Sequence, residues 1–236
     1  MAKICITGGA GFIAYHLTAK LWNEGHTVVS FDNFNDYYDP SLKRDRADIL
    51  LKSFGVDVRE VDLCDRLKLI DFMQDNKPDV VVHLAAYAGV RHSLDYPDGP
   101  WGRPDMALFD FTNNIVKGNP IELFNYGDMV RDFTYVDDIV AGIYVVIDRI
   151  TMHHDINEIY NIGYGDQVQL VDFVDSIEKH LGREAIRELV PMHPADTLAT
   201  WSDTSKLWAL GWKPKTALDE GVGNFIKWYK DYYNVN

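Results

Sequence analysis

The chain has 236 residues, of which 47% are hydrophobic and 25% charged, a composition typical of a globular protein with a sizeable core. Its formal net charge of −13 at pH 7 repels phosphate backbones and anionic lipid, which excludes nucleic acid and membrane surfaces as expected partners. We expect a cytoplasmic protein, because Cys5 and Cys64 give no disulfide framework and we find neither a signal peptide nor a spanning apolar run.

Strand and helix patterns alternate regularly over the first 84 residues. Short apolar runs predict buried strands at residues 3–7, 27–31, 56–61 and 79–84. We expect both cysteines to lie inside apolar elements. Apolar residues at helical spacing predict helices at residues 12–23, 40–54 and 67–75. The apolar face of the first helix consists of Phe12, Ile13, Leu17 and Leu21. This alternation is typical of a parallel sheet with right-handed crossovers.

The regular alternation ends after Leu84. Residues 85–102 contain several glycines and prolines near their end and no predicted element. Beyond them the sequence predicts helices at residues 104–117, 136–150, 170–181, 204–210 and 218–232. It also predicts short strands at residues 121–124, 158–162 and 186–190. We therefore expect a domain boundary near residue 100, followed by a smaller mixed α/β region.

A glycine cluster joins the first predicted strand to the first predicted helix. Gly8, Gly9 and Gly11 permit a tight turn and let a pyrophosphate approach the backbone, and the helix behind them offers N–H groups at its start. Asp32 ends the next predicted strand, where its carboxylate would accept hydrogen bonds from an adenosine ribose and repel a 2′-phosphate. The sequence thus predicts a Rossmann-type site for NAD rather than NADP; the alternative is an incidental glycine loop.

Longer motifs carry a resemblance to a known family. The motifs are TGGAGFI (7–13), FDNFNDYYD (31–39), VDLCD (61–65), HLAAYAGVRHSL (83–94), GPWGRPDMALF (99–109) and RDFTYVDDIV (131–140). With them the chain resembles the extended short-chain dehydrogenase/reductase family, the NAD-dependent epimerases and dehydratases, and within it the UDP-glucuronate 4-epimerase branch. Ala14 departs from the family pattern, because it stands where the third glycine is usual and adds one methyl group where helix meets strand.

The resemblance implies NAD as cofactor and a UDP-sugar as ligand. The implied NAD contacts are Gly8, Gly11, Phe12 and Ile13 at the turn, Asp32 and Asn33 at the ribose, Asp62 and Leu63 at the adenine, and Leu84, Ala85 and Ala86 along the cofactor. The implied substrate contacts are Arg131 at the phosphates, Asp196 near the sugar nucleotide, and Trp101 in a loop that closes over the uridine. A salt bridge from Arg131 to Asp132 or Asp128 is the alternative role of that arginine.

The segment that carries the family's catalytic residues is missing. In the family a long segment separates SLDYP (93–97) from GPWG (99–102), and it contains a Ser/Thr and a Tyr-x-x-x-Lys pair; here the two motifs are fused. The family tyrosine takes the proton of the sugar hydroxyl, and the lysine lowers its pKa. No tyrosine of this chain has a lysine four residues later. Tyr87 comes nearest, with Arg91, and Tyr87 with His92 is either a surrogate acid–base pair or part of a loop.

These observations predict an α/β fold. We expect a truncated Rossmann parallel sheet of about four strands at residues 1–98, and a substrate-binding type region with C-terminal helices at residues 99–236. Without its outer neighbours the strand at 79–84 becomes an edge, which invites pairing with another chain or cover from the second half. The usual family dimer is not expected, because its two helices lie in the missing segment. His153 and His154 match no metal spacing, and we expect no metal site.

Three functions stay open at this point. The first is an NAD-binding protein that retains the adenosine half of the cofactor site and has lost epimerase catalysis. The second is an active NAD-dependent nucleotide-sugar epimerase or oxidoreductase that uses substitute groups such as Tyr87 or His92. The third is a structural or regulatory protein whose exposed sheet edge is the functional surface. The intact glycine turn beside an absent Tyr-x-x-x-Lys favours the first.

Overall fold

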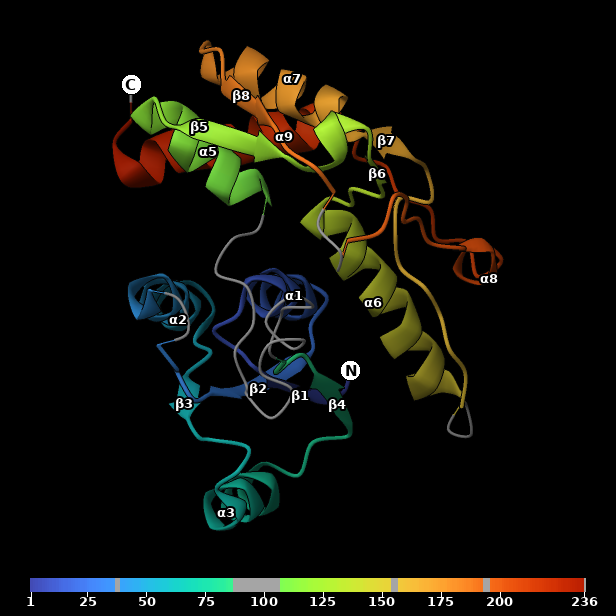
Figure 1. Ribbon diagram of the computed structural model, residues 1–236. Helices are drawn as coiled ribbons and strands as arrows, with labels where there is room; N and C mark the ends of the chain where they lie inside the picture. Colours follow the sequence, from blue (N-terminus) through green and yellow to red (C-terminus); the bar gives the residue numbers. More distant parts are fainter. Residues whose placement is uncertain (37–38, 87–106, 154–156, 193–195, 236) are drawn as a thin grey trace. The chain divides into compact units, whose positions relative to one another are not determined.

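The computed structural model describes residues 1–36, 39–86, 107–153, 157–192 and 196–235 (Figure 1). The chain divides into two compact units, residues 1–104 with 140–158, and residues 105–139 with 159–236. The domain boundary between residues 98 and 99 stays a prediction. The sequence did not indicate that residues 140–158 group with the N-terminal residues. Across the described ranges, no helix combines the length and apolar character needed to cross a membrane.

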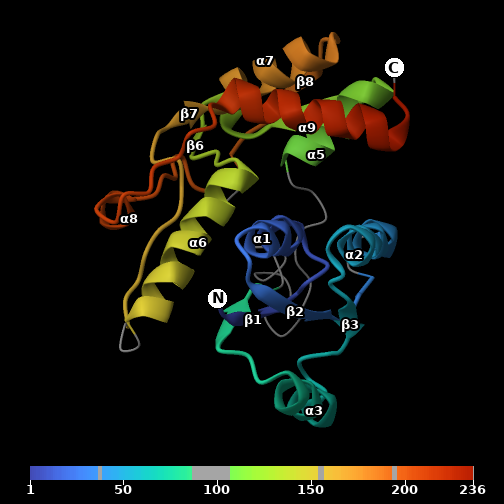
Figure 2. The ribbon, with the colours of Figure 1, turned by 180° about the vertical axis from the view of Figure 1, so that it is seen from behind.

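The first unit is built on a parallel sheet with the strand order β3-β2-β1-β4 (Figures 1 and 2). This confirms the truncated Rossmann sheet with four strands. Its elements are β1 (Lys3–Thr7), α1 (Phe12–Asn23), β2 (Thr27–Asp32), α2 (Pro40–Phe54), β3 (Val58–Glu60), α3 (Arg66–Asn76) and β4 (Val80–His83). Helices α1 and α2 cover one face of the sheet and α3 the other (Figure 1).

β1 is the most deeply buried strand of this sheet. Its Ile4, Cys5 and Ile6 are fully buried, because β1 has a strand on each side and helices on both faces. On the α3 face, Cys5 packs with Phe31 of β2 and Phe72 of α3. Burial of these apolar side chains is the main driving force for folding of the unit.

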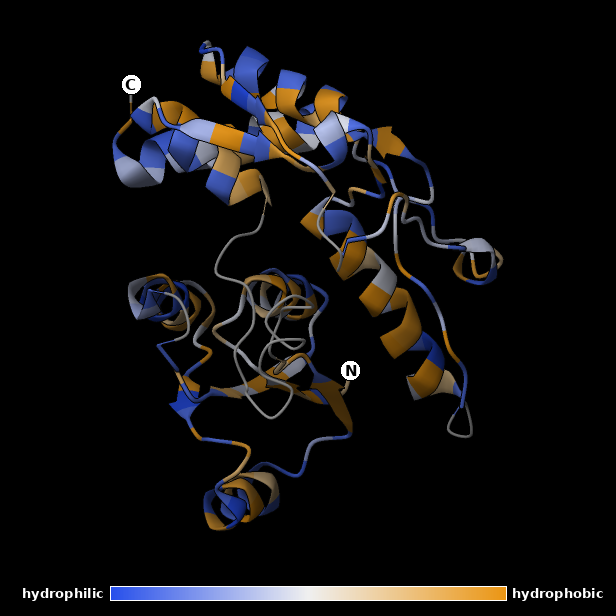
Figure 3. Cartoon of the chain, viewed as in Figure 1, coloured by the Kyte–Doolittle hydropathy of each residue, from blue (hydrophilic) through white to orange (hydrophobic). Residues whose placement is uncertain are grey.

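β4 forms one edge of the described sheet. It pairs with β1 from Ile4↔Val80 to Thr7↔His83 and has no strand beyond it among the described residues. The strand is hydrophobic for most of its length (Figure 3), yet Val81 is 49% exposed. Among the described residues β4 is therefore an edge strand, as predicted. Its expected self-association stays a prediction.

Two details of the first unit differ from expectation. Cys64 is exposed, because it lies in the loop after β3 rather than inside an apolar element. Phe12 and Ile13 were expected on the apolar face of the first helix, but they are 53% and 36% exposed. They occupy the first turn of α1, and the face that packs on the sheet consists of Ala14, Leu17, Thr18 and Leu21.

α6 (Val136–Met152) begins in the second unit, and from Val140 onward it belongs to the first. Within the first unit, the centroid of the Tyr144 ring on α6 lies 6.0 Å from the centroid of the His26 ring. The Lys20 Nζ atom lies 5.1 Å from the centroid of the same tyrosine ring. Burial raises the pKa of Tyr144 above its ordinary value. These contacts place the helix beside the C-terminal half of α1.

The second unit contains two short sheets and several helices. β5 (Pro120–Leu123) pairs in parallel with β8 (Ile186–Leu189), and β6 (Val130–Arg131) pairs antiparallel with β7 (Val168–Gln169). The other elements are α5 (Ala107–Lys117), η1 (Phe124–Gly127), α7 (Leu170–Leu181), α8 (Ser205–Trp208) and α9 (Leu218–Tyr233). The strand predicted at residues 158–162 is wrong, because this segment pairs with no strand among the described residues and Ile159 is 84% exposed.

A polar cluster joins α7 to α9 on the surface of the second unit. The Asp219 carboxylate accepts hydrogen bonds from Ser176 Oγ at 2.9 Å and from Lys179 Nζ at 2.7 Å, and it lies 3.1 Å from His180 Nε2. The two helices approach closely here, since a Cβ on Gly223 would lie 2.8 Å from the His180 ring. Hydrogen bonds from Lys179 and Ser176 lower the pKa of Asp219 to about 2.

Asp219→Asn tests this cluster. We expect the variant to melt about 2–4 °C below the wild type at pH 7, because it loses an ionised acceptor shared by two helices. The folded pKa is about 2 and the unfolded value 3.8, so the stabilisation is complete above pH 4 and disappears as the pH falls towards 2. Calorimetry across this range measures the difference. Asp231→Asn on the same helix is the matched control, and an unchanged difference at pH 2 would contradict the assignment.

A candidate dinucleotide site at the glycine turn

The turn between β1 and α1 lies directly against two neighbouring strands. Gly8 has φ +68°, a conformation that favours glycine, and a Cβ there would lie 2.8 Å from the backbone of Ala85, just after β4. A Cβ on Gly9 would lie 1.7 Å from Ser30 Oγ of β2. Both positions therefore require glycine, the first because of conformation and contact, the second because of contact alone.

The start of α1 carries no side-chain cap. Its N-cap residue, Gly11, makes no side-chain hydrogen bond, and the first turn contains no acidic residue. The positive end of the helix dipole is thus not offset by the chain's own carboxylates within the first turn. Ala14, which replaces the third glycine of the family pattern, is 1% exposed, so the helix accommodates its methyl group in a packed position. The arrangement suits an anionic group at the turn.

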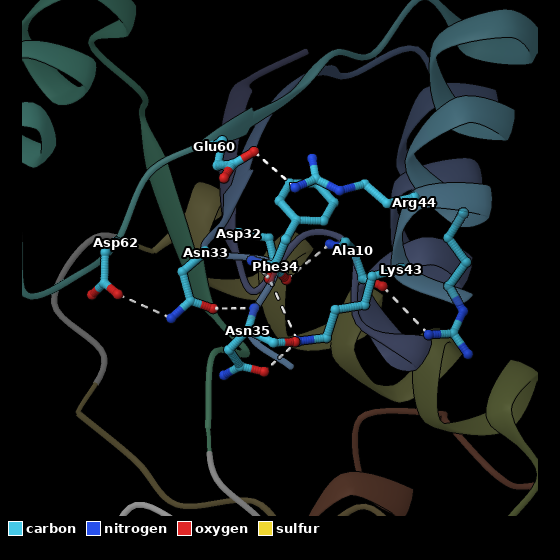
Figure 4. Close-up of polar contacts among 10 residues, drawn as sticks. Ala10, Asp32, Asn33, Phe34, Asn35, Lys43, Arg44, Glu60 and Asp62 are labelled. Carbon is cyan, nitrogen blue, oxygen red and sulfur yellow. Dashed lines mark hydrogen bonds and ion pairs between the residues drawn. The ribbon is translucent and has the colours of Figure 1, made fainter. Parts of the chain in front are cut away.

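Asp32 lies at the end of β2 beside this turn, with 7% of its surface exposed (Figure 4). One carboxylate oxygen accepts a hydrogen bond from the Ala10 backbone N–H at 3.2 Å, and the other accepts from the Phe34 backbone N–H at 2.8 Å. The Lys43 ammonium of α2 lies 3.9 Å from the same carboxylate. These contacts fix the orientation of Asp32 before any ligand binds.

Asn33 and Asp62 come together from the ends of β2 and β3. Asn33 Nδ2 donates to Asp62 Oδ2 at 3.0 Å, and the Cys64 backbone N–H donates to Asp62 Oδ1 at 2.7 Å. These hydrogen bonds lower the pKa of Asp62 below its usual value, so it is ionised at neutral pH. Leu63, which lies between Asp62 and Cys64 in the chain, is 37% exposed. The structure therefore brings Asn33 and Asp62 into contact, and the cofactor contacts of Asn33, Asp62 and Leu63 stay a prediction.

A hydrogen-bonded pair that the sequence did not indicate ties β4 to the turn. Thr7 and His83 are register partners at the ends of β1 and β4, and Thr7 Oγ1 lies 2.7 Å from His83 Nδ1. The Ala85 backbone N–H donates to the same hydroxyl at 3.1 Å. Thr7 is 4% exposed. The residues 84–86 are thus held at the turn through a buried hydroxyl, which periodicity alone does not reveal.

Two of the substrate-side residues, Arg131 and Asp196, belong to the second unit. Arg131 of β6 donates through Nη1 to the Val130 carbonyl at 2.8 Å and to the Leu198 carbonyl at 3.4 Å, and Asp196 is half-buried. Trp101, Tyr87 and His92 lie outside the described residues. No cluster of three or more histidine, cysteine or acidic side chains suited to a metal ion occurs in the part of the chain that the structure describes.

Asp132, next to Arg131, connects three segments of the second unit. Its carboxylate accepts hydrogen bonds from the backbone N–H groups of Tyr164, Gly165 and Ser202, and from Ser202 Oγ at 2.7 Å. It borders an open hollow of about 410 Å³. The residues lining the hollow are Asp132, Asn161, Thr200, Trp201, Ser202 and Asp203. The sequence reading treated Asp132 only as an ion-pair partner and missed this role.

The sequence of this chain matches a known family and several of its members. Residues 4–102 and 98–163 match the family model described as "NAD dependent epimerase/dehydratase family". The chain is 31% identical to a probable UDP-glucuronate 4-epimerase of Rhizobium meliloti (98% of each chain) and 30% identical to UDP-glucuronate 4-epimerase 1 of Arabidopsis thaliana (99% of this chain, 78% of that one).

A solved structure shares the fold. The crystal structure of UDP-glucuronic acid 4-epimerase from Bacillus cereus, in complex with UDP-glucuronic acid and NAD, matches with a TM-score of 0.85 at 24% identity, covering 96% of this chain and 99% of that chain. The alignment to the Arabidopsis protein extends over 335 positions, whereas this chain has 236 residues. The two family matches meet at residues 98–102, where the sequence analysis located the missing segment.

The contact between Gly9 and Ser30 is tested by a double-variant cycle. Gly9→Ala should lower the free energy of unfolding by about 1–3 kcal/mol, because its methyl group overlaps the Ser30 hydroxyl. In a Ser30→Ala background the same change should cost less, since the overlapping oxygen is gone. Urea unfolding of the four proteins measures the coupling. Strictly additive costs would show that the turn does not press on β2 at this point.

Proposed function

This chain belongs to the NAD-dependent epimerase/dehydratase family, and we propose that it binds NAD through the adenosine half of the site without catalysing epimerisation. The observation that carries the proposal is the preorganised carboxylate of Asp32 beside an uncapped helix start and a glycine turn closed by contact with Ala85. The same chain has no Tyr-x-x-x-Lys sequence anywhere along its length.

The residues around the turn fit the cofactor. A glycine turn on which a Cβ would meet backbone, and an α1 start without a side-chain cap, suit a pyrophosphate. Asp32 is a buried acceptor suited to ribose hydroxyls. The residues that would hold NAD are Gly8, Gly11, Phe12 and Ile13 at the pyrophosphate, Asp32 and Asn33 at the ribose, Asp62 and Leu63 at the adenine, and Leu84, Ala85 and Ala86 along the cofactor. When bound, NAD supplies a hydride acceptor.

Catalysis needs a group that this chain lacks in its usual place. A sugar hydroxyl gives up a hydride at a useful rate only when a base removes its proton, and a tyrosine does so only when its pKa is lowered by a neighbouring cation. The relatives are longer by a segment that has no counterpart here. A family member without that segment retains the surface for the adenosine half and loses the proton acceptor.

We propose a UDP-sugar as the second ligand. The support is that relatives carry the name UDP-glucuronate 4-epimerase and that one of them crystallised with UDP-glucuronic acid. Arg131, Asp196 and Trp101 are the residues assigned to this ligand by resemblance. In the second unit, Asp132 fixes the segment that follows Arg131 through several hydrogen bonds, which would limit the movement of the arginine.

Asp32→Asn tests the cofactor assignment. We expect the variant to bind NAD about tenfold more weakly than the wild type, because a neutral amide accepts a hydroxyl hydrogen bond less strongly than a carboxylate. Asp48→Asn is the matched control, since Asp48 lies on α2, is 67% exposed and pairs only at the surface with Lys52. Isothermal titration calorimetry measures both affinities. Equal affinities for wild type and Asp32→Asn would remove Asp32 from the site.

Proton NMR with NAD and UDP-glucuronate tests the absence of catalysis. We expect unchanged anomeric signals after one day, together with saturation transfer from the protein to the adenine protons. The Bacillus cereus enzyme serves as the positive control for turnover. A new anomeric signal of UDP-galacturonate, lost in a Tyr87→Phe plus His92→Ala variant, would instead establish an active epimerase with substitute groups.

A further inference from the structure

β4 is an edge strand without the residues that usually keep such an edge from pairing with another chain. Between Asp79 and His83 it consists of three valines, with no proline and no lysine (Figure 3). Val81 is 49% exposed, and among the described residues no strand lies beyond β4. A β-branched strand of this kind pairs readily along its open side.

The open side of β4 offers backbone hydrogen-bonding groups in a defined pattern. The Asp79 N–H donates to the Lys3 carbonyl at 2.8 Å, so the backbone of Asp79 faces β1. Because the polar groups of successive residues in an extended strand point to opposite sides, those of Val81 also face β1, and those of Val80 and Val82 point outward. Both of these outward residues can therefore hydrogen-bond to a further strand.

The α3 side of this edge presents a fixed order of side chains. Val81 is the register partner of Cys5, which packs on the α3 face, so the Val81 side chain points to the same face. Since side chains alternate along a strand, those of Asp79 and His83 share this face, and both residues are exposed. The order along the edge is thus an acidic group, an apolar group and an imidazole.

This order is self-complementary when two copies of the chain pair antiparallel. A two-fold axis perpendicular to the sheet at Val81 places Val81 opposite its own counterpart, and Val80 opposite Val82 of the second copy. The same register places Asp79 opposite His83 of the second copy, so each carboxylate meets an imidazole. An axis at Val80 would place Asp79 opposite Val81, and an axis at Val82 would leave Asp79 opposite no residue of β4.

The two polar side chains of this edge are already held in place within one copy. Asp79 Oδ2 accepts a hydrogen bond from the Lys3 backbone N–H at 2.7 Å. His83 Nδ1 lies 2.7 Å from Thr7 Oγ1. Each contact uses one polar atom of the side chain, so Asp79 Oδ1 and His83 Nε2 can take a further partner across the axis.

We propose that a second copy of this chain pairs with β4 about this two-fold axis, so that the two parallel sheets join into one continuous sheet. Val80 and Val82 of opposite copies exchange backbone hydrogen bonds, and the two Val81 residues meet at a non-hydrogen-bonded position with Cα atoms about 4.5 Å apart. The pairing residues are not among those assigned to NAD, so the inference goes beyond the proposed function and does not depend on it. Because one pair of short strands buries less surface than a standard interface, we expect a reversible dimer with a Kd on the order of 10 µM.

Sedimentation velocity of the full chain tests the pairing. We expect the wild type to pass from monomer to dimer between about 1 and 100 µM. Val81→Lys should stay monomeric over this range, because two ammonium groups would face each other across the axis. Leu51→Lys is the matched control, since Leu51 lies on α2 and is 50% exposed, much as Val81 is, and this variant should dimerise like the wild type.

A cysteine at position 81 tests the register. The background for this experiment is Cys5→Ala with Cys64→Ser, which removes both native cysteines, including the register partner of Val81. In it, Val81→Cys should form a disulfide-linked dimer on mild oxidation, because Cα atoms about 4.5 Å apart lie within disulfide range. Val80→Cys should not, since its counterpart lies further along the strand. Non-reducing gel electrophoresis measures the link, and Asp48→Cys, at a 67% exposed position, reports random collisions.

The outcomes support or overturn the inference as follows. A wild type that stays monomeric overturns it, and so does a dimer that Val81→Lys leaves intact. A link through position 80 in place of 81, or a link at 81 no faster than at 48, overturns the register. The inference is supported when Val81→Lys is monomeric with an unchanged circular dichroism spectrum and the cysteine at position 81 links the copies. If Val81→Lys loses its fold, the cross-linking result decides.

Discussion

The close packing of the glycine turn against β2 and β4 is the constraint on which the first unit depends. Gly8 meets the backbone of Ala85 and Gly9 meets Ser30, so the turn has no room for a side chain on either side. This contact sets how near α1 starts to the end of β2, and it lets the Ala10 N–H reach Asp32. One steric requirement thus determines both the packing of the sheet and the position of the carboxylate.

The position of the missing segment explains why this half of the fold remains intact. β1 keeps a strand on each side in the order β3-β2-β1-β4, so the core around Ile4 and Ile6 stays closed. The strand left partly exposed to solvent is β4, where the Val81 side chain is about half exposed. The residues assigned to the adenosine lie at the ends of β2 and β3, which are separated from β4 by β1. The loops at the ends of β2 and β3 therefore stay supported on the side of the sheet away from β4.

Much of this architecture could be predicted from sequence, for identifiable physical reasons. The buried strands, the glycine turn and Asp32 follow from short-range patterns that the fold imposes directly on the chain. Lys43 could not be found in this way, because its burial depends on the loop at Asn35, eight residues away, and not on helical periodicity. β6 and β7, with two residues each, carry no period, and the apolar run at 158–162 lacks the strand partner that would have made it a strand.

The buried pair of Asp32 and Lys43 contributes little to folding for the charge that it removes from water. Removing two charges from water costs several kcal/mol, and a well-packed apolar pair of similar size is often at least as stabilising. Here the charges do not even form a direct hydrogen bond, since 3.9 Å separates them. Their remaining hydrogen bonds go to loop and turn groups that border the proposed nucleotide site. The fold thus orients both charges before any ligand binds, and this is the property that the proposed cofactor site requires of its carboxylate.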